Sequence, residues 1–161
     1  MKIEDYVLNY DPMVDKERIV FAWNGKHAVD FKDANREFRL EVIGYFIEHA
    51  EATPIRLIRD LYTSETKFAE QAWGVNMVVS DLAEQLLKRG GIDYLEDYLA
   101  GLWRGMDAFI ASRRIKLSKE LNIKLADACM RLANLPENTG RKDQLEFTAG
   151  LFESAGKDRY N

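Results

Sequence analysis

Among the residues of this sequence, the carboxylates have the number and spacing that most resemble a catalytic site. Between Asp60 and Asp107 the acidic residues outnumber the basic ones. Two of them could act as a general acid and base, but that role needs carboxylates that face each other across a cleft. Asp93, Glu96 and Asp97 instead share the outer face of a predicted helix. We interpret the acidic residues as a solvated face or as a docking face for a basic partner, whose association an acidic surface accelerates.

The other residues with catalytic potential lack the partners that their chemistry requires. Neither of the two histidines, His27 and His49, has a second ligand at metal-binding spacing. The single cysteine, Cys129, excludes an internal disulfide, and its place beside an apolar helical stripe is typical of a buried thiol. The sequence contains no phosphate-binding loop, nucleophile elbow or dinucleotide-binding motif. We therefore expect a protein that is not an enzyme and that uses no metal and no cofactor.

Trp73 and Met77 are the most suggestive apolar residues. They lie one helical turn apart, on the side opposite the apolar stripe of their predicted helix. Trp and Met are favoured as anchors in protein interfaces. We favour burial of both under a second layer of helices. The alternative is an exposed pair that anchors a partner or a second copy of the chain.

Gly101 and Gly105 flank Trp103 and Arg104 in what the pattern predicts to be one helix. Glycine inside a helix costs roughly 1 kcal/mol relative to alanine, so a compensating contact is expected. Two glycines one turn apart let another backbone approach closely. We therefore predict tight packing inside the domain here, with a flat ligand groove as the alternative.

Nucleic acid and membranes are not expected partners. The net charge is −4 and the pI is near 5.3, whereas nucleic-acid binders are usually basic. One basic cluster lacks the area and the interleaved aromatic residues of a nucleic-acid site; it contains Arg113, Arg114, Lys116, Lys119 and Lys124. No signal peptide is visible, and no apolar run approaches the roughly 20 residues that span a bilayer. With a single cysteine, this predicts a cytoplasmic protein.

The stretch 64–112 carries the strongest helical signal and predicts a central helical hairpin. Apolar residues recur there every three or four positions on both sides of Gly90 and Gly91. A glycine pair after Lys88 and Arg89 is typical of a helix C-terminus. Further helices are predicted from Asp30 or Asp33 to about Ala50, and over 54–62, 118–132 and 141–155, with a frayed tail at 157–161.

The segment 18–31 predicts a β-hairpin. Asn24 and Gly25 separate two β-prone runs, and both residues tolerate the positive φ angles of a tight hairpin turn. A helical alternative for Lys16 to Trp23 remains open.

Together these features predict one mainly α domain over 1–161. We expect a helical bundle or short HEAT-like stack of about six helices, with a small N-terminal β-hairpin. Because a catalytic set is missing, we expect a protein–protein interaction module, of the class of toxin-neutralising immunity proteins or adaptors. It would cover a basic partner, such as a nuclease-type toxin, by steric and electrostatic occlusion. The expected contact residues are Trp73, Met77, Asp81, Glu84, Asp93, Asp97 and Arg104.

Other functional hypotheses stay open. The first is a small-molecule-binding or regulatory domain with a pocket between the central hairpin and the 34–50 helix. The second is an enzyme that works through carboxylates alone, and the third is a protein that simply dimerises through Trp73 and Met77.

Overall fold

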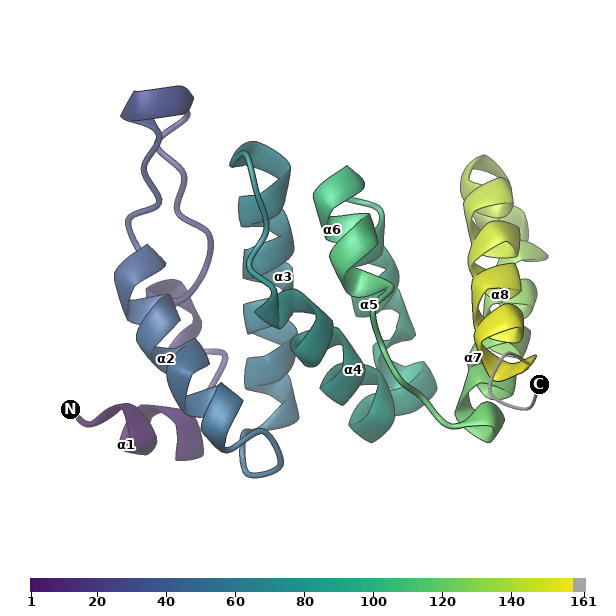
Figure 1. The fold of residues 1–161 in the computed structure, drawn as a ribbon, viewed down its shortest axis with the longest axis horizontal. Helices are drawn as coiled ribbons and strands as arrows, with labels where there is room; N and C mark the ends of the chain where they lie inside the picture. The colour runs from purple at the N-terminus through teal and green to yellow at the C-terminus, as the bar shows by residue number, and fades with distance from the viewer. Residues whose placement is uncertain (158–161) are drawn as a thin grey trace.

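The computed structural model describes residues 1–157 as a mainly helical chain (Figure 1). Its α-helices are α1 (Ile3–Leu8), α2 (Arg36–Glu48), α3 (Ile55–Gln71), α4 (Val78–Gly90), α5 (Leu95–Leu102), α6 (Met106–Ser112), α7 (Lys119–Ala133) and α8 (Lys142–Lys157). Short 3-10 helices are η1 (Lys16–Arg18), η2 (Ala28–Asp30), η3 (Gly91–Tyr94) and η4 (Pro136–Arg141). The mainly α prediction is confirmed. Apart from Lys157, the predicted frayed tail lies outside the described residues.

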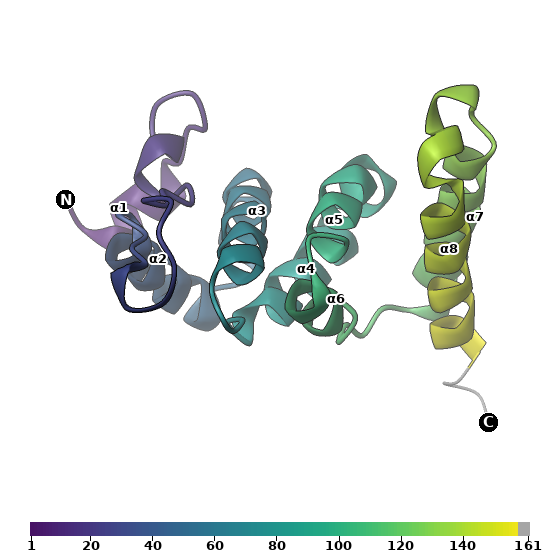
Figure 2. The same cartoon turned by 90° about the horizontal axis from the view of Figure 1, so that it is seen from above.

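Consecutive helices pack against each other in pairs. The pairs α1 and α2, α3 and α4, α5 and α6, and α7 and α8 are all in contact. They stand side by side in one row, and the two chain ends lie at opposite ends of that row (Figures 1 and 2). Contacts of α3 and α4 with α5 and α6 join the two central pairs. The row therefore offers a long surface relative to its thickness.

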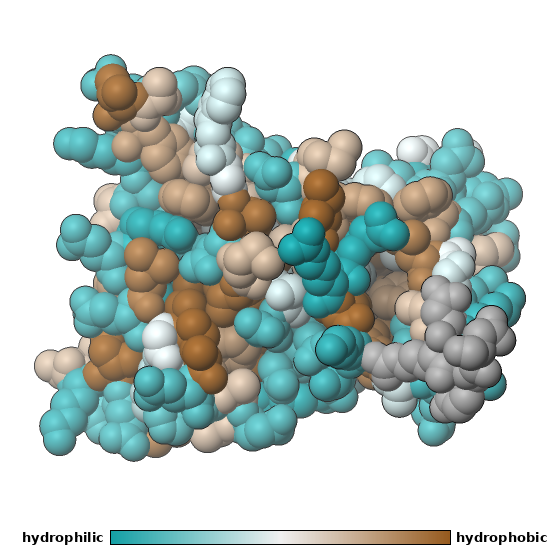
Figure 3. All heavy atoms as spheres, in the orientation of Figure 1, coloured by the Kyte–Doolittle hydropathy of each residue, from teal (hydrophilic) through white to brown (hydrophobic). Residues whose placement is uncertain are grey.

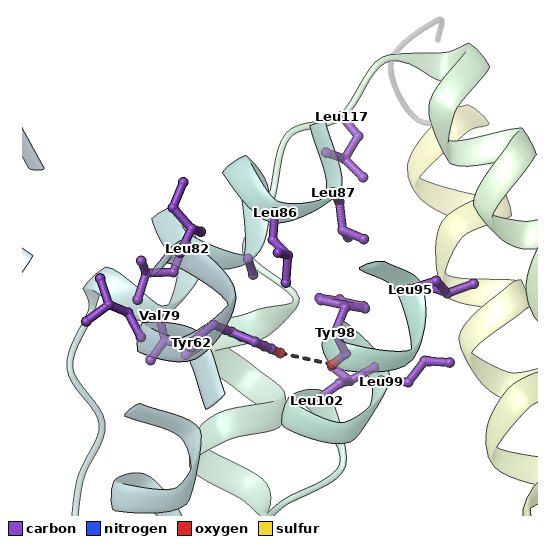
Figure 4. Close-up of a cluster of buried hydrophobic side chains, with 14 of the residues drawn as sticks. Tyr62, Val79, Leu82, Leu86, Leu87, Leu95, Tyr98, Leu99, Leu102 and Leu117 are labelled. Atoms are coloured by element: carbon purple, nitrogen blue, oxygen red, sulfur yellow. Dashed lines mark hydrogen bonds between the residues drawn. The ribbon is translucent and has the colours of Figure 1, made fainter. Parts of the chain in front are cut away.

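A continuous set of buried apolar side chains extends from Tyr6 in α1 to Phe152 in α8. Its central part is drawn in Figure 4, where α3, α4 and α5 contribute most of the side chains. Tyr62 of α3 crosses this layer, and its hydroxyl donates a hydrogen bond of 3.1 Å to the carbonyl oxygen of Tyr98 (Figure 4). Side chains three and four residues apart on each helix supply the contacts, as the periodicity predicted.

The predicted β-hairpin at 18–31 is wrong. Gly25 adopts a positive φ of 76°, but Asn24 does not adopt one, so the expected two-residue hairpin turn does not form. Only one isolated bridge forms here, between Trp23 and Asp33, and η2 interrupts the second of the two β-prone runs. The side chain of Asn24 explains why the two runs do not pair as strands. Its amide nitrogen donates to the carbonyl of Asp30 at 2.7 Å, and its oxygen accepts from the backbone of Lys32 at 3.1 Å.

Local side-chain bonds of this kind satisfy backbone groups that a strand ladder would otherwise use. The aromatic residues of the segment serve a different purpose. The rings of Phe21 and Phe31 pack edge-on against Phe68 of α3, with ring centroids 6.1 and 5.5 Å apart. The β-prone residues thus attach a loop to the helices instead of pairing two strands.

A buried ion network also holds this N-terminal loop. Arg39 of α2 is fully buried, and its guanidinium bonds to the carboxylate of Asp33 and, at 2.7 Å, to that of Glu65 in α3. The same guanidinium donates to the carbonyl oxygen of Ile19 at 3.3 Å. A single side chain therefore connects the loop, α2 and α3.

The predicted central hairpin at 64–112 contains two breaks. The first is the segment 72–77, where Gly74 has a φ of 143°, and the second is 103–105, which ends at Gly105 before α6. The expected boundary at Thr63 and Ser64 is also wrong. The Ser64 hydroxyl donates to the carbonyl of Asp60 within the same turn, so α3 continues to Gln71. The stop at Gly91, with a φ of 55°, agrees with the prediction.

Candidate functional site

Two of the predicted contact residues, Asp81 and Glu84, line one pocket between α2 and α4. Phe46, Ile47 and Ala50 of the α2 side and Gln85 of α4 complete its wall, and its volume is about 210 Å³. We call it the acceptor pocket, defined by these residues. It lies where the sequence placed a ligand pocket, between the central hairpin and the 34–50 helix.

The positions of these side chains follow from the local helices. Residues three and four apart share one face of a helix, so the pocket residues of α4 point towards α2 together. Arg89, at the end of α4, donates hydrogen bonds to the carbonyl oxygens of Ala50 at 3.1 Å and Thr53 at 2.6 Å. These bonds fix the last turn of α4 against the connection between α2 and α3. The walls of the pocket are therefore held on both sides.

The acceptor pocket contains hydrogen-bond acceptors without donors. The carboxylate of Asp81 is exposed and accepts no hydrogen bond from a residue in the described part of the chain, whereas the side-chain oxygen of Gln85 is buried and has no hydrogen-bond partner. Partial burial raises the pKa of Asp81, and the neighbouring charge of Glu84 raises it further. Glu84 itself is engaged by the Lys88 ammonium at 3.1 Å and by the backbone N–H of Lys116. The pocket is thus suited to a hydrogen-bond donor that carries positive charge.

Asp97 belongs to a different electrostatic group. Its pKa is raised mainly by burial, while the nearby Arg59 lowers it and Asp60 raises it. Asp60 is 2% exposed and accepts a hydrogen bond of 2.8 Å from Tyr10. This group connects the segment that follows α1 with α3 and α5. Asp93, on η3, is exposed. The structure therefore does not bring all the predicted acidic residues into one patch around Asp81.

The favoured interpretation of Trp73 and Met77 as buried residues is wrong. The side chain of Trp73 is 99% exposed and that of Met77 is 58% exposed. The physical reason is the break at 72–77: these residues lie on a connection, so the helical face expected to be covered does not exist there. Arg104 is half-buried and donates a hydrogen bond of 3.2 Å to the hydroxyl of Thr66. Arg104 therefore links the connection 103–105 to α3.

The structure shows an apolar groove beside Trp103 and Gly105, where the sequence analysis gave a flat ligand groove as the alternative to tight packing. Trp103, Met106, Phe109 and Phe147 line a groove of about 330 Å³, together with Leu102 and Gly105. We call it the aromatic groove. Apolar side chains reach the surface between α6 and α8 in this region (Figure 3). The rings form a connected set, with centroids 5.2 Å apart for Trp103 and Phe109 and 6.0 Å apart for Trp103 and Phe147.

Local contacts fix the shape of the aromatic groove. The indole N–H of Trp103 donates a hydrogen bond of 3.2 Å to Thr148 of α8, so this ring spans the space between α5 and α8. Arg113 lies over the ring of Phe109, 5.1 Å from its centroid. Phe147 gave a further sequence signal for the groove. Phe147 falls outside the apolar stripe of its helix and is 54% exposed.

The described residues show no arrangement typical of a catalytic or metal centre. No group of three or more His, Cys, Asp or Glu within 1–157 could hold a metal ion. His49 is exposed and stacks on Tyr45, with ring centroids 4.3 Å apart. Cys129 is fully buried, and burial raises the pKa of its thiol to about 12. In the part of the chain that the structure describes, no helix has the length and apolar character needed to cross a membrane.

Comparison of the chain with protein-family models, with curated proteins and with solved structures found no match.

Proposed function

We propose that this chain is a protein-binding module that recognises a basic partner at the acceptor pocket. The observation that carries the proposal is the buried, unpartnered oxygen of Gln85 beside the exposed carboxylate of Asp81, above an apolar wall. Lysine and arginine have a complementary build, with an apolar stem and a charged head that only donates hydrogen bonds. The stem would lie on Ile47 and Ala50 while the head reaches Asp81.

The mode of action that we propose is steric and electrostatic occlusion. A module that covers the basic site of a partner, such as the nucleic-acid groove of a nuclease-type toxin, blocks that site without any chemistry of its own. The acidic surface speeds encounter with such a partner, and a side chain anchored in the acceptor pocket sets the register. This is the action of an immunity-type protein or an adaptor.

The arrangement of the helices supports this proposal. Stacks of helix pairs, including HEAT-like stacks, present extended surfaces on which protein partners bind. The pairing of consecutive helices in one row supports a HEAT-like description of this chain. The rigid attachment of α4 through Arg89 also favours binding, since a preorganised pocket loses little entropy when it is filled.

The test is affinity capture at low salt with the full chain, followed by a titration of the captured partner against matched variants. We expect a basic protein whose affinity falls as salt rises. Asp81→Lys should weaken its binding at least tenfold, because the new ammonium repels the partner's cation in the pocket. Glu153→Lys on α8 makes the same charge change at an exposed site away from the pocket and should leave the affinity close to that of the wild type. Equal affinities for the two variants would contradict the proposal.

A small cationic ligand is the second candidate for the same pocket. The volume of about 210 Å³ and the mixture of apolar wall and acceptors favour it. Thermal unfolding with added linear amines separates the two candidates. A rise in melting temperature that Asp81→Asn abolishes, with no basic protein captured, would favour the ligand-binding function.

A further inference from the structure

The aromatic groove continues into a second depression beside the loop 72–77. The second depression has a volume of about 650 Å³ and includes Trp73, Gly74 and His27 in its wall. Gly105 and Met106 line both depressions. One long surface feature therefore has Trp73 at one end, Met106 in the middle and Phe147 at the other end.

Trp73 is an unusual residue to find at the end of such a feature. Its side chain is 99% exposed, so almost all of the indole ring faces water. Tryptophan has the largest apolar side chain, and a fully exposed one gains free energy when a partner covers it. Met106, in the middle, is also 72% exposed. An apolar projection and an apolar groove thus lie next to each other on the same face.

We infer that a second copy of this chain occupies the aromatic groove and places its Trp73 there. In a twofold interface the same patch is used by both copies, so each contact between two different residues occurs twice. Trp73 and Phe147 lie on either side of Met106. A twofold axis near Met106 brings Trp73 of each copy into the groove of the other and sets the two Met106 side chains against each other.

Charge complementarity supports this arrangement. The end of the feature that carries Trp73 includes the carboxylates of Glu70 and Asp107, with His27 as its other titratable group. At the groove end the guanidinium of Arg113 lies over Phe109. The twofold rotation places the acidic end of one copy opposite Arg113 of the other. Both copies make this pairing, which favours the dimer over random apolar contact.

The surface buried in the proposed dimer is that of a small, reversible interface. A fully covered aromatic side chain removes about 150–250 Å² from water. Because each residue is used twice, covering Trp73, Met106 and Phe147 buries an area below the range of about 1,200–2,000 Å² for stable specific interfaces, as in weak and transient complexes. The dimer should therefore be weak, and its population should rise with protein concentration. This inference goes beyond the proposed function, since the acceptor pocket lies on other helices and Asp81 takes no part in it.

Sedimentation velocity of the full chain over a range of concentrations is the first test. The mass should rise from the monomer value of 18.6 kDa towards twice that value. Trp73→Ala should weaken association at least tenfold, while Met13→Ala, at a site that is 91% exposed and far along the chain, should leave it unchanged. A wild-type chain that stays monomeric into the millimolar range, or Trp73→Ala that associates as the wild type does, would overturn the inference.

Cross-linking of two single-cysteine additions tests the geometry. A mixture of Trp73→Cys and Phe147→Cys chains brings both new thiols to one junction and leaves the other junction unchanged. Oxidation should give a disulfide between the two different chains, and Cys129 should not compete because it is fully buried. Cross-links only between identical variants, or none in a mixture that forms dimers, would rule out this arrangement. A groove that a helical peptide from another protein fills while the chain stays monomeric would also overturn the inference.

Discussion

The ring of Tyr62 lies directly against Gly101, with its hydroxyl oxygen 2.6 Å from the place that a Cβ atom on Gly101 would take. Tyr62 is fully buried in α3, and Gly101 belongs to the last turn of α5. The missing side chain lets these two helices approach. The sequence predicted this tight packing for Gly101 but also for Gly105, where a Cβ would meet no atom within 4 Å.

Gly101→Ala should destabilise the fold by about 1–3 kcal/mol, the usual cost of adding a methyl group to a close-packed core. The intrinsic preference of helices for alanine opposes this loss only weakly. Urea denaturation followed by circular dichroism measures the difference. Gly44→Ala in α2 is the matched control: a Cβ there meets no atom within 4 Å, so it should stabilise the protein by about 0.5–1 kcal/mol. If both variants gained stability, Tyr62 would not be confined by Gly101.

Arg39→Ala should destabilise the protein by about 3–5 kcal/mol. The change leaves the buried carboxylates of Asp33 and Glu65 without their shared partner, and one oxygen of Glu65 already lacks a donor. Arg36→Ala is the control. Arg36 also pairs with Glu65, but its side chain is 23% exposed, so water can replace it and a smaller loss is expected. Urea denaturation measures the stability that each variant loses. Equal losses would show that the burial of Arg39 does not determine its contribution to stability.

The pair between Glu96 and Arg141 should stabilise the fold in a pH-dependent way. Hydrogen bonds of 2.7 and 2.9 Å from Arg141 hold the pKa of Glu96 below its ordinary value of 4.5. A carboxyl whose pKa is lowered by folding contributes stability above its unfolded pKa, and this contribution disappears as pH falls through the folded value. Glu96→Gln should therefore cost up to about 1 kcal/mol at pH 7, since the pair is exposed.

The difference in the free energy of unfolding between Glu96→Gln and the wild type should become smaller as the pH is lowered below 4.5. Denaturant titrations at pH 7, 5 and 3 measure it. Glu120→Gln is a suitable comparison, because its ion pair with Lys124 is more exposed and should contribute less at every pH. A difference for Glu96→Gln that stayed constant with pH would contradict the assignment of the lowered pKa to this pair.

Several elements could be read from the sequence because local physics decides them. Ser118 was expected to begin a helix, and its hydroxyl does accept a hydrogen bond of 3.1 Å from the backbone of Leu121 at the start of α7. The apolar period over 118–132 continues without interruption to the end of that helix. The stop at Gly91 is equally local, since a positive φ suits glycine.

The breaks at 72–77 and 103–105 could not be read in the same way. The apolar period continues through both of them, and a single glycine is tolerated in many helices, so Gly74 and Gly105 gave only a weak signal. This also explains why a groove at 101–105 was only the alternative interpretation and why its residues on α6 and α8 were not predicted. Trp103, Phe109 and Phe147 come from different elements, and only the packing of α5 and α6 beside α8 brings them together. Asp81 and Glu84 were found because they share one helix face.

The attachment of α7 and α8 to the rest of the row links occupation of the aromatic groove to the detachment of this helix pair. α7 and α8 pack chiefly on each other, and among their main contacts with earlier helices are those between α7 and η3. In such rows the free energy of unfolding is a sum over units and the interfaces between neighbours, so an end unit can detach while the middle stays folded. A molecule seated in the aromatic groove touches α6 and α8 at once. A molecule bound there stabilises the attachment of α7 and α8 to the preceding helices. Amide hydrogens of α7 and α8 should therefore exchange more slowly when the groove is filled.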